Sequence, residues 1–126
     1  NRTTIMLSEE SIQENIAGHE SRNPELLATM RDMGIDLQQS RSVEHHFLAE
    51  SQHNASLLAR ALHEKGYLIL MLSPVDSEDA SNSNPWNVEA GIQRTPEEAA
   101  SSLISEELVR LAAQFDAVYD GWGTPV

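Results

Sequence analysis

The sequence lacks cysteine, long apolar runs and any signal of secretion. The absence of cysteine from all 126 residues excludes disulfides, thiolate nucleophiles and cysteine-based zinc or iron–sulfur sites. It is typical of proteins in the reducing cytoplasm, where we expect this chain to act. The longest apolar run, residues 67–72, is far shorter than the ~20 residues that span a bilayer. No signal peptide is visible, although the first residue is not Met and a segment upstream can be missing.

Basic residues are also scarce. Eight Lys and Arg stand against 20 Asp and Glu, which gives a formal net charge of −12. Because the basic residues are scattered, no basic stripe is available for a phosphate backbone, and we expect no direct binding of nucleic acid. An acidic surface favours a basic protein as the partner. We expect no membrane partner, and a homo-oligomer remains open.

No group of residues indicates catalysis, a metal site or a cofactor. His45 and His46 are adjacent, so on a strand they point to opposite faces and cannot chelate one ion together. We expect one of them to be buried beside a neighbour such as Glu44, and the other to face solvent. The sequence has no Gly-x-Ser-x-Gly elbow and its glycines are isolated, so no nucleophile or phosphate loop is favoured. We therefore predict a protein that is not an enzyme.

Residues 1–40 predict an N-terminal extension of one or two short helices. Residues 11–14 have the Ser-x-x-Glu pattern of a capping box. Gly18 and residues 21–23 are expected to break this helix, and Asn23 with Pro24 to begin a second one. Gly34 is expected to end the second helix.

Residues 41–126 predict a domain of four strands and two helices. Strands are expected near residues 42–49, 67–73, 86–94 and 118–124, and helices near 52–65 and 97–115. The polar residues between 73 and 85 predict a loop. The clearest helix start is Thr95, because Pro96 suits the first turn and Glu98 can complete a capping box.

The order of these elements, β-α-β-β-α-β, predicts an α+β fold with a ferredoxin-like antiparallel sheet. Right-handed crossovers place both helices on one face of the sheet, and the first and last strands become neighbours. The strand at residues 67–72 is apolar on both faces. This indicates that the opening helices or a second subunit cover part of the other face.

Three segments of the sequence are distinctive. Residues 115–124 contain Tyr-Asp-Gly-Trp-Gly-Thr, residues 44–46 are Glu-His-His, and residues 65–67 are Lys-Gly-Tyr. All three resemble segments of the RraB family of ribonuclease E regulators, whose members end their domain with the first of them. The resemblance, over about residues 40–126, implies a ferredoxin-like α+β fold. It also implies a protein that binds ribonuclease E outside its catalytic domain and slows RNA decay.

The two most similar segments should lie side by side, because they belong to neighbouring strands. We therefore predict a site for a protein partner formed by Glu44, His46, Tyr119, Asp120 and Trp122. An alternative interpretation is structural: Gly121 and Gly123 permit unusual backbone angles in a turn or bulge, and Trp122 fills the edge of the core.

Two rival functions remain open from the sequence. The first is a ligand-binding or hydrolytic domain that uses Glu44, His46 and Tyr119 on the open face of the sheet. The second is an acidic immunity-type inhibitor of a basic nuclease.

Overall fold

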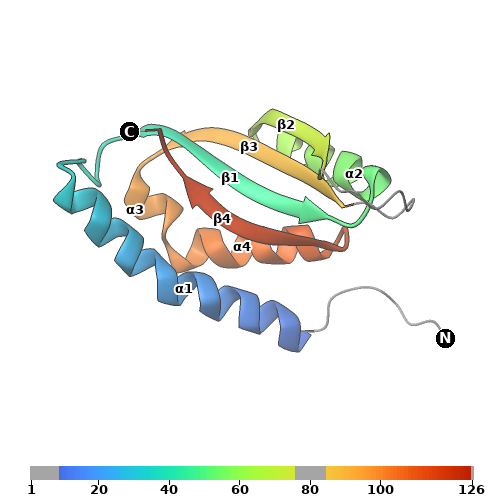
Figure 1. Cartoon of the computed structure of the whole chain (residues 1–126), viewed down its shortest axis with the longest axis horizontal. Helices are drawn as coiled ribbons and strands as arrows, with labels where there is room; N and C mark the ends of the chain where they lie inside the picture. The colour runs from blue at the N-terminus through green and yellow to red at the C-terminus, as the bar shows by residue number, and fades with distance from the viewer. Residues whose placement is uncertain (1–8, 76–84, 126) are drawn as a thin grey trace.

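The structure, a computed structural model, describes residues 9–75 and 85–125. In chain order the elements are α1 (Glu9–Asp32), β1 (Arg41–Ala49), α2 (Gln52–Glu64), β2 (Leu68–Pro74), β3 (Trp86–Arg94), α3 (Pro96–Ala99), α4 (Ser102–Ala113) and β4 (Ala117–Gly123). The strands form one antiparallel sheet in the order β2-β3-β1-β4 (Figure 1). The predicted α+β class and the pairing of the first and last strands are confirmed. Most of the predicted loop at residues 73–85 lies outside the described residues.

The alternation of side chains in β1 separates the two faces of the sheet. Every second residue points into the core and is buried: Val43, His45, Phe47 and Ala49. The residues between them, Glu44, His46 and Leu48, point to the opposite face. We call this second face the open face, because α2 and α4 pack on the first.

The predicted break in the N-terminal segment is wrong. α1 is one helix of 24 residues that passes through Gly18 and carries Pro24 in its interior. Pro24 has no N–H to give to the helix and would ordinarily end it. Asn23 does not cap a helix here, because its side chain bonds to Ala100 and Ser105 and so fixes this turn against the rest of the fold. Within the described residues, no helix is long and apolar enough to cross a membrane.

The predicted helix at residues 97–115 is divided in two. The capping box of Thr95 and Glu98 is confirmed and begins α3, which ends after one turn. The Ser101 hydroxyl then accepts a hydrogen bond from the Ile104 N–H and begins α4. A second capping residue six positions after the first explains the interruption.

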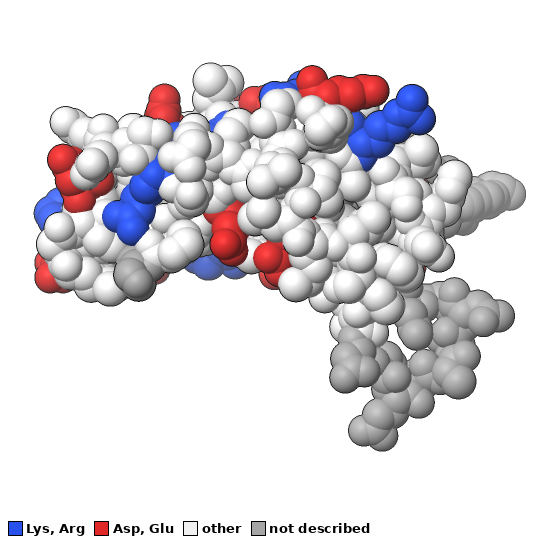
Figure 2. All heavy atoms as spheres, turned by 90° about the horizontal axis from the view of Figure 1, so that it is seen from above, with Lys and Arg blue, Asp and Glu red and all other residues white. Residues whose placement is uncertain are grey.

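β2 lies at an edge of the sheet and remains exposed. Leu68 and Leu70 are 65% and 46% exposed, so the opening helices do not cover this strand. The other expected cover, a second subunit, stays a prediction. α1 instead packs along α4 (Figure 1). Figure 2 looks down on the β2 and β3 side of the molecule, where broad uncharged areas separate a few carboxylates and the basic side chains lie apart from one another.

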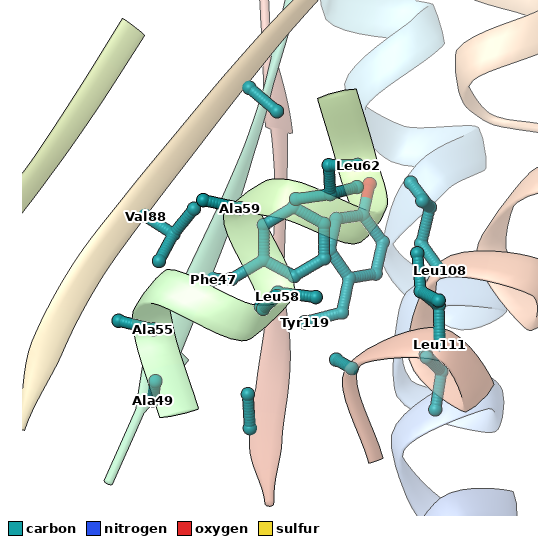
Figure 3. Packing of buried hydrophobic residues seen from close by; sticks show 14 of the residues in the cluster. Phe47, Ala49, Ala55, Leu58, Ala59, Leu62, Val88, Leu108, Leu111 and Tyr119 are labelled. Atoms are coloured by element: carbon teal, nitrogen blue, oxygen red, sulfur yellow. The ribbon is translucent and has the colours of Figure 1, made fainter. Parts of the chain in front are cut away.

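The main core lies between the sheet and its two long crossover helices. Leu58 and Leu62 of α2 and Leu108 of α4 meet Phe47 and Tyr119 of the sheet (Figure 3). The i, i+4 spacing of the two α2 leucines places them on one face of the helix, as its sequence predicts. Ile16 of α1 joins the same cluster. The core therefore places Tyr119, one of the predicted site residues, at its centre.

Candidate functional site

A β-bulge in β4 decides which of the predicted site residues reach the surface. The pairing of β4 with β1 shifts at Asp120, which has no partner in β1. Gly121 follows with a φ of 127°, a conformation that glycine adopts readily. Because of the extra residue, Tyr119 and Trp122 both face the core although they are three positions apart. The structural interpretation of this segment, a bulge with Trp122 at the core edge, is therefore correct.

Tyr119 joins three elements inside the protein. Its side chain is 1% exposed, and its hydroxyl shares a hydrogen bond of 2.8 Å with Nδ1 of His45 in β1. Its carbonyl oxygen accepts a hydrogen bond of 2.9 Å from Nε2 of His19 in α1. The ring also packs against the Phe47 ring, with 5.2 Å between the centroids. Tyr119 therefore supports the surface from below and does not present its ring to solvent.

Trp122 is held in a similar way and is 8% exposed. Its Nε1–H donates a hydrogen bond of 3.1 Å to Oδ1 of Asn23. The Asn23 amide nitrogen donates in turn to the Ala100 carbonyl oxygen at 3.2 Å and to the Ser105 hydroxyl at 3.3 Å. This one amide connects α1, β4 and the segment that joins α3 to α4, so the indole position depends on it.

The other predicted site residues lie together on the open face. His46 Nε2 is 4.0 Å from a Glu44 carboxylate oxygen, and His46 Nδ1 is 3.8 Å from a Glu89 carboxylate oxygen. The side chains of Glu44 and His46 are each 37% exposed. Asp120 projects from the bulge beside this row and is exposed. These four residues form what we call the acidic row.

A cavity of about 320 Å³ lies between the acidic row and α1. His46, Asp120 and Trp122 line it from the sheet, and His19 and Arg22 line it from the helix. The cavity thus brings three of the five predicted site residues together. Glu44 is outside the lining, but its carboxylate lies 4.0 Å from the His46 ring. Tyr119 is the one that lies behind it, in the core.

The opposite orientations of His45 and His46 are confirmed, but the predicted partner of the buried histidine is wrong. His45 is fully buried and bonds to Tyr119, whereas Glu44 lies beside the exposed His46. Alternation explains this result, because Glu44 and His46 are two residues apart and share a face. Burial lowers the pKa of His45 to about 3, and the positive charges of Arg94 and His46 add to this effect.

Three residues at the site, Glu89, His19 and Asn23, were not predicted from the sequence. Glu89 pairs with His46 across β1 and β3, a register that becomes visible only when the two strands are aligned. His19 and Asn23 were placed in a helix that was expected to break. One turn apart on a continuous helix, they face β4 together. Burial lowers the pKa of His19 as well, which suits a neutral ring that donates to Tyr119 and accepts from Arg22.

The acidic row can bind positively charged groups. Three carboxylates and an imidazole offer hydrogen-bond acceptors that suit the guanidinium group of arginine or the ammonium group of lysine. In residues 9–75 and 85–125, no three His, Asp or Glu side chains converge in a way that could hold a metal ion.

Comparison with known proteins points to a regulatory role. Residues 20–124 match the family described as Regulator of ribonuclease activity B. The chain is also similar to a protein of Psychromonas ingrahamii named Regulator of ribonuclease activity B, with 27% identity over 114 residues. That alignment covers 90% of this chain and 93% of the relative.

Replacing Asn23 with Ala should lower the free energy of unfolding by about 2–3 kcal/mol, because it leaves Trp122 Nε1 and other buried polar groups without partners. Asn15→Ala in the same helix is the control, because it makes the same chemical change away from these bonds. Urea denaturation followed by circular dichroism measures both variants. Equal stability of the two would show that the amide does not hold the indole.

The stability of the protein should fall as the pH is lowered below about 6.5, in part because of His45. The unfolded histidine takes up its proton near pH 6.5, whereas the folded one does so near 3. Between these values the unfolded state binds more protons than the folded state. Each unit by which the pH falls therefore lowers the free energy of unfolding by about 1.4 kcal/mol. His45→Gln should flatten this slope between pH 7 and 5 in urea melts. If the variant loses stability with falling pH as steeply as the original chain, His45 is not the cause of this pH dependence.

Proposed function

Because the chain belongs to the RraB family of regulators of ribonuclease activity, we propose that it is a non-enzymatic regulator that binds a ribonuclease. The proposed target is ribonuclease E or a similar enzyme of the cytoplasm, and binding would slow RNA decay. The acidic row is the observation that supports this proposal. It groups Glu44, His46, Glu89 and Asp120 on one half-exposed face of a protein whose net charge is −12.

The mechanism that we propose is masking. A basic segment of the ribonuclease, which would otherwise hold RNA or another protein, places its Arg or Lys side chains against the acidic row. Tyr119 and Trp122 contribute by holding the bulge that projects Asp120, since both side chains are buried. The predicted site thus divides into residues that touch the partner and residues that position them.

We also propose the finer architecture that the family resemblance implies. The order β2-β3-β1-β4 supports a ferredoxin-like arrangement for residues 41–126. Residues 1–40 would be its helical extension, attached through Ile16 and Asn23.

The rival ligand-binding or hydrolytic function is not favoured. It requires Glu44, His46 and Tyr119 to act on one molecule. The first two lie on the open face, whereas the Tyr119 hydroxyl is in the core and bonded to His45. The sheet itself therefore separates the groups that such chemistry would need.

The proposal is tested with whole ribonuclease E, a defined RNA substrate and the purified chain. We expect the chain to bind the ribonuclease and to slow cleavage of the RNA. The double variant Glu44→Gln with Asp120→Asn should bind about tenfold more weakly, because it removes two charges from the acidic row. Binding is measured by calorimetry and cleavage by gel electrophoresis.

The control is Glu10→Gln with Glu97→Gln, which removes the same charge from exposed positions on α1 and α3. It should bind almost as tightly as the original chain. An equal loss of affinity in the two double variants would show that only the net charge of the chain matters. No binding of the original chain would refute ribonuclease E as the target.

A further inference from the structure

A groove of about 610 Å³ lies on the open face beside the acidic row. Leu68 and Leu70 of β2 form one side of it, Gly91 of β3 lies in its lining, and Glu44 of β1 and Pro125 lie on the other side. Glu44 belongs to both surfaces, so the groove continues the proposed ribonuclease-binding site.

Gly91 makes room for the Leu70 side chain in the wall of the groove, because it has no side chain of its own. A Cβ atom there would lie 2.9 Å from Cδ1 of Leu70, closer than real contacts allow. The pairing of β2 with β3 shifts between Ile69 and Met71, which leaves Leu70 as an extra residue in β2. Its side chain therefore extends over Gly91 and provides an apolar wall.

The β2 side of the groove is apolar and exposed to solvent. Leu68 is 65% exposed and Leu70 is 46% exposed, and both line the groove. Leu48 of β1 and Val118 of β4, which are 41% and 40% exposed, lie on the same face beyond His46 and Glu89. Exposed apolar side chains that line a groove on a monomer are typical of interaction sites.

Charge decides which occupant the groove fits. Its lining includes Glu44 and contains no Lys or Arg. Glu89 lies two residues before Gly91 on the same face of β3, about 7 Å away in an extended strand. A second copy of the chain would bring its own Glu44 and Glu89 against these carboxylates, which is unfavourable. A partner with a basic side chain next to an apolar one meets both requirements.

We propose that the groove beside Gly91 and Leu70 holds an apolar side chain of an extended, basic segment of the protein partner. An Arg or Lys residue two positions away in that segment meets Glu89, because alternate residues of an extended peptide share one face and lie about 7 Å apart. A second basic side chain of the segment meets Glu44, which belongs to the lining of the groove. This inference rests on the proposed function and specifies the chemistry of the segment that is bound.

Two synthetic peptides test the proposal without the ribonuclease. Acetyl-Ser-Arg-Ser-Leu-Ser-Arg-Ser-amide places Arg, Leu and Arg on one face, and the matched peptide has Ser in place of Leu. NMR titration of the isotope-labelled chain gives both dissociation constants. We expect the Leu peptide to bind about tenfold more tightly. A third peptide with Glu in place of both Arg residues should bind more weakly than either.

Leu68→Ser should abolish the preference for the Leu peptide. Leu103→Ser is the matched control, because Leu103 is also highly exposed but lies on α4, outside the groove. Gly91→Val, which should displace Leu70 and fill the groove, provides an independent check. The proposal is overturned if the Leu and Ser peptides bind equally, if Leu68→Ser keeps the preference, or if the Glu peptide binds as tightly.

Failure of this inference differs from failure of the proposed function. If the chain binds ribonuclease E but Leu68→Ser changes the binding of neither the peptides nor the ribonuclease, the groove proposal is wrong. The proposed binding site at the acidic row is then unaffected. If sedimentation shows a dimer that Leu68→Ser converts to a monomer, a second copy fills the groove and the proposal is again overturned. If the chain prefers the Leu peptide but does not bind ribonuclease E, the groove proposal is supported and ribonuclease E is refuted as the target.

Discussion

Burial of the Tyr119 side chain is the constraint on which the rest of the structure depends. Its hydroxyl bonds to His45 of β1, its carbonyl oxygen to His19 of α1, and its ring packs on Phe47. The long N-terminal helix, the first strand and the last strand are therefore fixed at one residue. A buried hydroxyl or carbonyl without a partner is costly, so the three elements cannot separate without a loss of stability.

The bulge that follows Tyr119 connects this core to function. Without it, strict alternation would turn Trp122 to the open face and place Gly121 in the core. The extra residue keeps the indole inside, where Asn23 binds it, and leaves Asp120 on the outer face without a partner in β1. The open face is thus left with carboxylates, one imidazole and exposed leucines. Charge and apolar contact on one surface suit recognition of a basic protein segment.

Much of this structure could be predicted from the sequence, and the errors have physical causes. Period-two alternation located β1, and the Thr95 capping box located α3, because both signals are local. Pro24 gave a strong local signal for a helix boundary, but the tertiary bonds of Asn23 override it. The pairing of Glu89 with His46 depends on strand register, which no single segment encodes. Strand order predicted that β1 and β4 are neighbours, but the inward direction of Trp122 follows from the bulge.

We propose that the ribonuclease binds the open face of the sheet and not the helical face. Methyl NMR of the leucine-labelled chain, recorded as whole ribonuclease E is added, tests this. We expect the methyl signals of Leu48, Leu68 and Leu70 to shift or broaden first, while those of Leu57 on α2 and Leu103 on α4 keep their positions. The reverse result, with changes confined to Leu57 and Leu103, would contradict it.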